Sequence, residues 1–228
     1  MSDTRWIPAA DVAELRRAAF KRIIDAAGRA IAARGAFIIS LAGGNTPRDV
    51  YAMLREADTD WALWHVYYGD ERCVSRGDPE RNSRMAHTAW LDHVSIPAAN
   101  IHDIPAEMGA DAGAAAYGKT LKGTGDFDLT LLGLGEDGHT ASLFPGHEWG
   151  DAFGSPAAIA VFDAPKLPSE RVSLSAARLS HSREVLFLVA GESKRGAVAK
   201  WSSGANIPAR AIRPAAGVDV FVEASLLG

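Results

Sequence analysis

The chain has 228 residues, of which 47% are hydrophobic and 23% are charged, and its formal net charge is -4. These values are typical of a soluble globular protein and exclude the basic surface with which proteins bind nucleic acids or anionic membranes. Every apolar stretch is shorter than the ~20 residues of a membrane span, and the single cysteine, Cys73, excludes an intrachain disulfide and a cysteine-built zinc site.

The hydrophobic pattern alternates between helical and strand periods along the chain. Apolar residues from Val12 to Ala30 recur at steps of three and four, which predicts an amphipathic helix over about 9–33 that ends at Gly35. Further helices are expected at 82–93, 110–121 and 192–201, and strands at 36–41, 64–68, 128–132, 157–162, 184–190 and 218–222. This alternation indicates an α/β fold of the Rossmann-like kind, with a mostly parallel sheet and helices on both faces.

The chain contains no internal repeat, low-complexity tract or obvious linker, so we expect a single α/β domain over 1–228, with a small cap within the Pro/Gly-rich segment 145–170. Ligands of such sheets bind beyond the carboxyl ends of the strands. The segments that follow the predicted strands, and that should supply the site, are AGGNTP, GDER, GLGEDGH and GESK.

The first of these segments is a glycine-rich turn. Gly43 and Gly44 permit a tight turn after a buried strand, and Thr46 is expected to cap a helix whose first residue is Pro47 and whose third is Asp49. The free amides of such a helix start attract an anion such as phosphate. An ordinary strand-to-helix turn without a ligand fits this segment equally well.

The second segment places three charges, Asp70, Glu71 and Arg72, at the same edge. Arg72 is a candidate to bind a phosphate or a developing oxyanion, with its guanidinium held by an adjacent carboxylate. Downstream, Lys194 follows a buried strand near the start of a helix, and Arg171 precedes a short apolar segment. Two or three cations that converge on a helix start describe a phosphate pocket.

The third segment, GLGEDGHTASLFPG, spells G-x-G-x-x-G at Gly133, Gly135 and Gly138. A dinucleotide fingerprint requires an uninterrupted helix after it, and Pro145-Gly146 interrupts the chain, so cofactor binding is the less favoured interpretation. The favoured one is a tight turn that presents His139 as a general base, with Asp137 orienting its ring. Ser142 lacks the G-x-S-x-G context of a nucleophile and is expected in a packed helical turn.

Taken together, the segments SLAGGNTPRDVYAML, YYGDERCVSRGDPERNS, DLTLLGLGEDGHTASLFPG and LPSERVSL…REVLFLVAGESK resemble the 6-phosphogluconolactonases, within the family that also contains glucosamine-6-phosphate deaminase. They occur in the family's order over roughly 36–200. The resemblance implies a fold similar to the glucosamine-6-phosphate deaminase/ribose-5-phosphate isomerase type, no metal or nucleotide cofactor, and hydrolysis of 6-phospho-D-glucono-1,5-lactone to 6-phospho-D-gluconate in the oxidative pentose phosphate pathway.

Site residues follow from the matched positions. The resemblance implies catalytic roles for His139 and Arg72, and Asp137 joins them as the residue expected to orient the histidine ring. It also implies phosphate binding by Lys194 and by the glycine-rich turn of Gly43, Gly44, Asn45 and Thr46, and the segments themselves add Asp70 and Arg171 as candidate substrate-binding residues. Two positions depart from the family's pattern, because Asn45 replaces the more usual serine and Asn82-Ser83 stands in reversed order after the Asp-Glu-Arg segment.

The alternatives are a glucosamine-6-phosphate deaminase-like enzyme, a non-catalytic sugar-phosphate-binding protein and a nicotinamide-binding oxidoreductase. The deaminases tend to carry Asn-Glu-Pro after their histidine, where this chain has Ser142-Leu143-Phe144-Pro145. We expect a small-molecule substrate, no nucleic acid or membrane partner, and a monomer or small homo-oligomer. The charged start of the chain lacks the apolar centre of a secretory signal, so a cytoplasmic location is expected.

Overall fold

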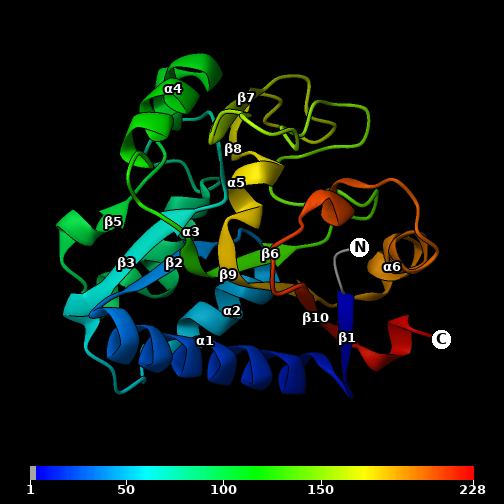
Figure 1. Ribbon diagram of the computed structural model, residues 1–228, viewed down its shortest axis with the longest axis horizontal. Coiled ribbons are helices and arrows are strands. Elements are labelled where there is room, and N and C mark those ends of the chain that lie inside the picture. The colour runs from blue at the N-terminus through cyan, green and yellow to red at the C-terminus, as the bar shows by residue number, and fades with distance from the viewer. Residues whose placement is uncertain (1–3) are drawn as a thin grey trace.

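The computed structural model describes residues 4–228 and contains two sheets (Figure 1). The large sheet has seven strands in the order β1-β10-β9-β6-β2-β3-β5, and every neighbouring pair is parallel. Its strands are β1 (Thr4–Ala9), β2 (Phe37–Leu41), β3 (Trp64–Tyr68), β5 (Ile101–His102), β6 (Phe127–Gly133), β9 (Ser182–Val189) and β10 (Val218–Glu223). The expected mostly parallel α/β fold is thereby confirmed.

The second sheet is small and antiparallel. It contains β4 (Asp70–Arg72), β7 (Ala158–Val161) and β8 (Arg171–Leu174), with β8 in the middle. Gly69 alone separates β3 of the large sheet from β4 of the small one, and its backbone bonds to both sheets, to Leu41 at 2.9 Å and to Leu174 at 2.8 Å. The two sheets are therefore joined at the carboxyl end of β3.

The α-helices are α1 (Val12–Arg34), α2 (Asn45–Leu54), α3 (Asn82–Ala89), α4 (Ala110–Thr120), α5 (Ala176–Ser180) and α6 (Arg195–Ser202). Figure 1 shows α1 along one side of the large sheet, whereas α4 lies with β7 and β8 on the other side. The expected helix over 9–33 is confirmed, and Gly35 ends it in the left-handed conformation, at φ 77°. The expected helix at 192–201 is a 3₁₀ turn, η5 (Glu192–Lys194), followed by α6.

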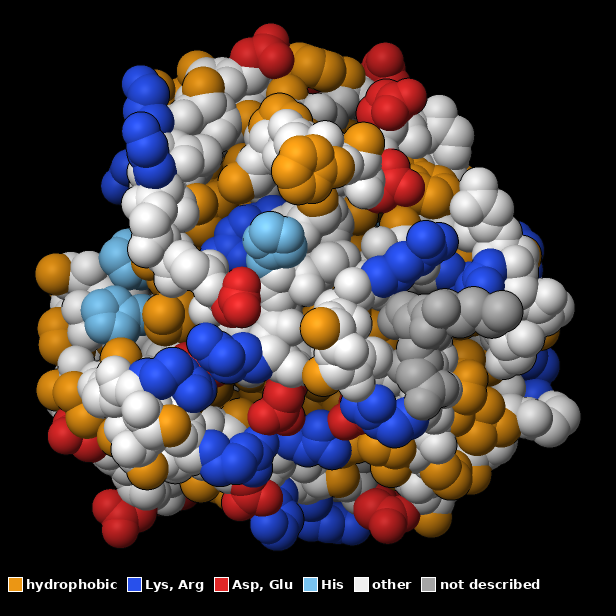
Figure 2. Space-filling view, in the orientation of Figure 1, with side chains coloured by type: hydrophobic (Ala, Val, Ile, Leu, Met, Phe, Trp, Pro, Cys, Tyr) orange, Lys and Arg blue, Asp and Glu red, His pale blue; other side chains and the backbone are white. Residues whose placement is uncertain are grey.

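The core lies between the large sheet and its helices. Leu15, Ala19, Ile23 and Ala30 form the buried stripe of α1 that the periodicity predicted. The opposite stripe of α1 is charged, and Figure 2 shows Lys and Arg side chains interspersed with Asp and Glu side chains over this helix. Charges of both signs therefore offset one another on this face.

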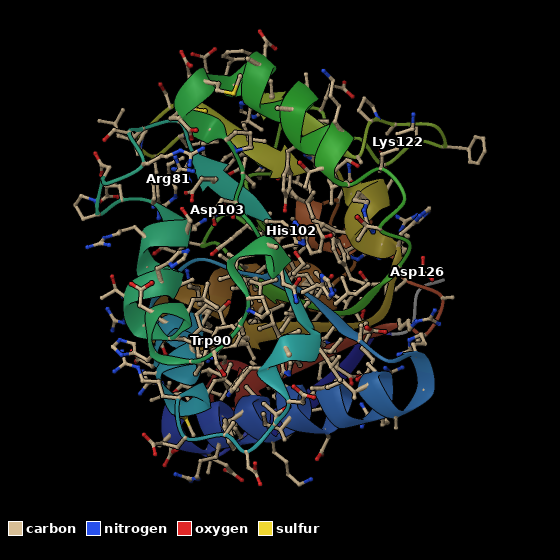
Figure 3. The ribbon with its side chains drawn as sticks, turned by 90° about the vertical axis from the view of Figure 1, so that its left-hand side faces the viewer. Arg81, Trp90, His102, Asp103, Lys122 and Asp126 are labelled. Carbon is tan, nitrogen blue, oxygen red and sulfur yellow. The ribbon has the colours of Figure 1, made fainter. Side chains whose placement is uncertain are left out.

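A second part of the core is aromatic and lies near the other end of the sheet. Trp64 packs edge-on against Phe37 and Trp90, with ring centroids 4.7 and 5.6 Å apart, and all three side chains are fully buried. Trp90 follows α3 and Arg81 precedes it, as Figure 3 shows. Both ends of α3 are thus fixed in the interior, which holds the first residue of that helix, Asn82, in a defined place.

Three local predictions are wrong. β1 was missed because it is an edge strand with a charged, proline-containing sequence, which edge strands tolerate. Thr46 is not a cap, since α2 begins at Asn45, its N-cap is Gly44, and the cap makes no side-chain hydrogen bond. Ser142 lies not in a helical turn but in a tight turn in which the Leu143 amide donates to the oxygen of Thr140 at 2.9 Å and Ala141 has φ 47°. The division into one domain with a cap at 145–170 stays a prediction.

None of the helices among residues 4–228 is long and apolar enough to cross a membrane.

Candidate active site

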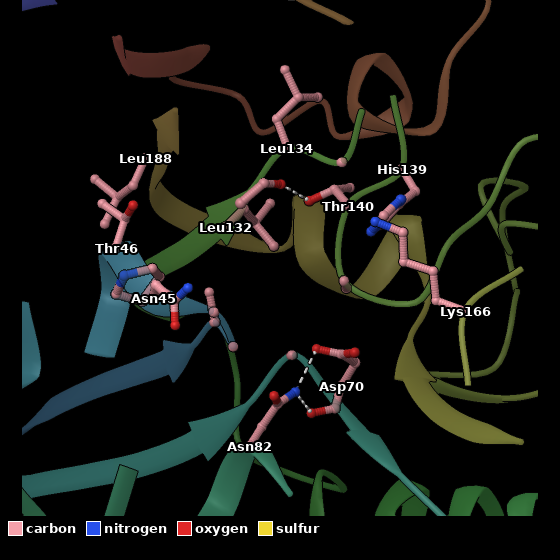
Figure 4. A pocket seen from close by; sticks show the side chains of 18 of the residues that line it. Asn45, Thr46, Asp70, Asn82, Leu132, Leu134, His139, Thr140, Lys166 and Leu188 are labelled. Carbon is pink, nitrogen blue, oxygen red and sulfur yellow. Dashed lines mark hydrogen bonds between the residues drawn. The ribbon is translucent and has the colours of Figure 1, made fainter. Parts of the chain in front are cut away.

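A cavity of about 600 Å³ lies at the carboxyl ends of β2, β3, β6 and β9 (Figure 4). After β2 the chain continues to β3 on one side, whereas β6 lies on the other side of β2, so the cavity sits where the strand order reverses. Such a reversal is where open α/β sheets bind ligands. All four segments expected at this edge line the cavity, and so does Arg171 from the small sheet.

The glycine-rich turn forms one wall. Gly43, Gly44, Asn45 and Thr46 line the cavity directly before and at the start of α2. The first amides of an α-helix have no partner inside the helix, and here Gly44 supplies no capping side chain. The turn therefore presents unsatisfied backbone donors and the positive end of the α2 dipole to the cavity.

Asn82 holds this wall to the small sheet. Its Nδ2 donates to the backbone oxygen of Asp70 at 3.0 Å and to Oδ1 of the same residue at 3.1 Å, as drawn in Figure 4. A Cβ atom on Gly43 would overlap the Asn82 amide, so only glycine permits this close approach. The sequence analysis left the role of Asn82 open. Its position between two cavity walls could not be predicted from the residues that neighbour it in the chain.

His139 and Asp137 lie together, as predicted. The Nδ1–H of His139 donates to Oδ1 of Asp137 at 2.6 Å, and the His139 backbone amide donates to the same oxygen at 3.0 Å. Because the carboxylate accepts the Nδ1 proton, Nε2 of the neutral ring carries the free lone pair. His139 lines the cavity, with a fifth of its side chain exposed.

The glycines of G-x-G-x-x-G shape the turn that carries this histidine. The amide of Gly138 donates to Gly135 at 3.0 Å, and the amide of Gly135 donates to the oxygen of His139 at 2.7 Å. Gly138 has φ 98°, a conformation that favours glycine. A Cβ atom on Gly135 would overlap the imidazole. The structure thus supports the interpretation of a tight turn over that of a dinucleotide fingerprint.

The surroundings of His139 favour its neutral form. Burial lowers the pKa of His139 below its ordinary value, and Lys194 lowers it further, whereas Asp137 and Asp70 oppose the shift. Burial alone would raise the pKa of Asp137, but the amide and ring of His139 bring it below its usual range. A neutral imidazole beside an ionised carboxylate is the state that a general base requires.

Three basic side chains from the predicted set converge on the cavity: Arg72, Arg171 and Lys194. Arg72 and Arg171 are directly opposed in the β4–β8 pair. The guanidinium of Arg72 contacts Glu80, through its backbone oxygen and through Oε2 at 3.6 Å. The carboxylate that contacts this guanidinium is therefore not an adjacent one in the sequence, as expected, because the Glu71 carboxylate turns inward to accept the backbone amides of α3.

Arg171 and Lys194 are partly desolvated cations. Arg171 is 6% exposed, its Nε and Nη2 donate to the backbone oxygens of Pro168 and Lys166 at 3.1 and 2.8 Å, and burial lowers its pKa. Burial also lowers the pKa of Lys194, opposed by Glu136 and reinforced by Lys166. Buried positive charge is costly unless an anion balances it, so the cavity favours an anionic ligand.

Lys166 is a cavity residue that the sequence analysis missed. It lies in the segment between β7 and β8, and Figure 4 shows its side chain directed toward His139. A lysine between two prolines in a loop carries no periodic signal, so nothing in the sequence distinguished it from surface charge. Asp70 also lines the cavity, but both of its carboxylate oxygens already accept hydrogen bonds, from Asn82 and Ser142.

This fold and site define an α/β protein with an anion-binding cavity and a carboxylate-oriented histidine. The model of the family of glucosamine-6-phosphate isomerases/6-phosphogluconolactonase matches residues 10–221, and the chain belongs to this family. A 6-phosphogluconolactonase of Mycobacterium tuberculosis is 39% identical over 219 residues, which cover 90% of this chain and 87% of the relative. A second, from Synechocystis, is 42% identical over 199 residues, covering 82% and 81%.

Among solved structures, a 6-phosphogluconolactonase from Thermotoga maritima superposes with a TM-score of 0.89 at 24% identity, covering 97% of this chain and all of the other. At that identity the likeness establishes the fold alone. It agrees with the mostly parallel seven-stranded sheet.

Proposed function

We propose that the protein hydrolyses 6-phospho-D-glucono-1,5-lactone to 6-phospho-D-gluconate, the second step of the oxidative pentose phosphate pathway. The observation that carries this proposal is the 2.6 Å contact of His139 with Asp137 in a cavity lined by Arg72, Arg171 and Lys194. A base and an anion-binding wall in one cavity are what hydrolysis of a phosphorylated ester requires. The relatives named 6-phosphogluconolactonase support the same substrate.

Substrate binding is assigned first to the phosphate. The amides at the start of α2, from Gly43 to Thr46, with Lys194 and Arg171, bind the phosphate oxygens. Asp70, an anion, repels phosphate, so we assign it to the sugar hydroxyls and to the framework of the site. The lactone carbonyl then lies near His139.

The chemical step uses His139 as a general base. Its Nε2 takes a proton from a water molecule, whose oxygen attacks the lactone carbonyl carbon. Arg72 or the backbone amides of the turn stabilise the tetrahedral oxyanion. The bond between the carbonyl carbon and the ring oxygen then breaks, and the imidazolium returns its proton to that oxygen. Asp137 holds the ring tautomer and stabilises the imidazolium as it forms.

Ring opening of an amino sugar is less well supported. That reaction needs a further acid–base group after the histidine, and this chain has Ser142-Leu143-Phe144-Pro145 there, a stretch without a carboxylate in which Leu143 and Phe144 are buried. A lactone requires no such group, since its ring oxygen leaves as the product hydroxyl. A non-catalytic sugar-phosphate-binding protein would use the cavity but would not need the Asp137–His139 pair.

His139→Asn is the decisive test. The side chain keeps its size and polarity but cannot accept a proton at neutral pH, so kcat should fall by roughly 10²–10⁴-fold. Acid release from the lactone is measured in a pH-stat, with the spontaneous hydrolysis of an enzyme-free sample subtracted. Binding of 6-phospho-D-gluconate, measured by calorimetry, should change little because the phosphate ligands remain.

Full activity of His139→Asn would contradict the proposal. An inactive wild-type protein that binds 6-phospho-D-gluconate would favour the non-catalytic alternative, and turnover of glucosamine 6-phosphate would favour the deaminase.

A further inference from the structure

Ser142 connects the histidine turn to the small sheet. Its hydroxyl donates to Oδ2 of Asp70 in β4 at 2.6 Å, and its amide donates to the hydroxyl of Ser173 in β8 at 3.3 Å. The side chain is 1% exposed and does not line the cavity. Ser142 therefore reaches the site only through other residues.

Among residues 4–228, the other hydrogen bonds around His139 do not reach the small sheet. The Gly135 amide bonds to His139 at 2.7 Å, the Thr140 hydroxyl to the oxygen of Gly133 at 2.9 Å, and the Leu143 amide to Thr140 at 2.9 Å. These bonds are local, within 133–143. One further bond, from the amide of Ala209 to Gly138 at 3.2 Å, comes from the carboxyl-terminal part of the chain. Figure 4 shows that His139 and Asp70 approach the cavity from different elements.

The backbone between His139 and Ser142 is strained. Ala141 has φ 47°, in the left-handed region, where its Cβ atom is crowded by the following carbonyl. A non-glycine residue stays in this conformation only when its surroundings impose it. The two hydrogen bonds of Ser142, the residue after Ala141, can impose this conformation, because they attach the chain to β4 and β8.

Asp70 is a rigid acceptor for this attachment. It is 6% exposed, and its other oxygen accepts from Asn82 at 3.1 Å. The neighbouring carboxylate of Glu71, fully buried, accepts the amides of Asn82 and Ser83, both at 2.8 Å, which fixes β4 against α3. The Asp70 carboxylate is itself held in place. Its hydrogen bond to the Ser142 hydroxyl therefore restricts the movement of the turn that carries Ser142.

We propose that Ser142 is a positioning residue for the reaction, whose hydrogen bond to Asp70 holds the His139 turn in register with Arg72 on the small sheet. The proposal rests on the proposed function, in that His139 is taken as the base. General-base catalysis depends on the distance between the base, the water and the carbonyl, so a small shift of this turn reduces kcat.

The test compares Ser142→Ala with the control Ser182→Ala. Ser182 is also a buried serine, hydrogen-bonded to Thr130 at 2.8 Å and to Leu179 at 2.7 Å, but it lies at the amino end of β9, outside the cavity. Both variants should lower the melting temperature to a similar extent. Only Ser142→Ala should lower kcat, on the order of ten- to a hundredfold, with KM little changed.

Rescue at Ala141 separates positioning from general weakening of the fold. Glycine adopts φ 47° without a steric cost, so Ala141→Gly in the Ser142→Ala background should restore a large part of the lost kcat. A double variant no more active than Ser142→Ala would overturn the proposal. If Ser142→Ala does not fold, the same comparison is made with Ser142→Cys, which keeps a weaker donor and should lose less kcat.

The outcomes distinguish this proposal from the function on which it rests. If His139→Asn is inactive while Ser142→Ala folds and retains wild-type kcat, the positioning role is wrong and the hydrolase proposal stands. If His139→Asn retains full activity, the hydrolase mechanism is wrong, and the positioning role is overturned with it.

Discussion

The imidazole of His139 lies directly on the backbone of Gly135, so closely that a Cβ atom there would overlap Nδ1, Cε1 and Cγ of the ring. Gly135→Ala should therefore displace the ring from Asp137 and from the cavity. Because the cost falls on one side chain at the cavity wall, we expect kcat to fall at least about tenfold while the melting temperature changes little. The measurement is steady-state kinetics beside thermal unfolding.

Gly133→Ala is the matched control within the same motif. A Cβ atom on Gly133 would meet no heavy atom of the described part of the chain within 4 Å, so this variant should lose far less kcat than Gly135→Ala. Equal losses of kcat at the two glycines would mean that the turn accepts no side chain at either position. Contact with His139 would then not be the cause of the loss in Gly135→Ala.

Asp137→Asn tests how the carboxylate acts on the histidine. Asp137 raises the pKa of His139 against the lowering by burial, so its removal should lower that pKa further. A base works only above its own pKa, so the acid limb of kcat/KM should move to lower pH in this variant. The plateau value should also fall, because an amide no longer fixes the Nδ1–H tautomer. A limb that moved to higher pH would contradict this assignment.

Lys194→Met should move the same limb in the opposite direction. Lys194 lowers the pKa of His139, so removing its charge raises that pKa, and activity should begin to fall at a higher pH than in the wild type. Loss of a charged phosphate contact costs about 1.5–3 kcal/mol, or roughly a ten- to hundredfold increase in KM. Since the substrate's own ionisation is common to all variants, differences between their pH profiles report the enzyme.

The sequence predicted the parts of the fold and site that depend on local pattern. The buried strands and α1 follow from periodicity, and the rule that ligands bind at carboxyl strand ends brought Gly43, Arg72, His139 and Lys194 to one edge. These residues lie in the short segments that follow their strands, so their place in space follows from their place in the chain.

The features that the sequence did not predict depend on contacts between segments that are distant in the chain. Asn82 meets Gly43, and Ser142 meets Asp70, across separations that no hydrophobic period encodes. The edge strand β1 was hidden for a related reason, since its pairing with β10 joins the two ends of the described chain. The contact between Arg72 and Glu80 likewise depends on a loop that folds back. Proximity in the sequence favoured the carboxylates of Asp70 and Glu71 instead.

The charge of Lys166, in the outer part of the cavity, should contribute less to substrate binding than that of Lys194. Its side chain is exposed, whereas Lys194 is half-buried, so the same charge should be screened more strongly by solvent and salt at Lys166. Lys166→Ala should therefore raise KM less than Lys194→Met, and its effect should shrink as the ionic strength rises. The effect of Lys194→Met should persist in high salt.

Lys122→Ala is the control, because Lys122 is an exposed lysine that does not line the cavity (Figure 3). KM is measured for the three variants at two ionic strengths, on either side of ~0.15 M, where the screening length is about 8 Å. A KM for Lys166→Ala that equals the wild-type value even in low salt would place its ammonium outside the reach of the substrate. An effect as large as that of Lys194→Met in high salt would mean that the loop closes over the bound phosphate and removes Lys166 from solvent.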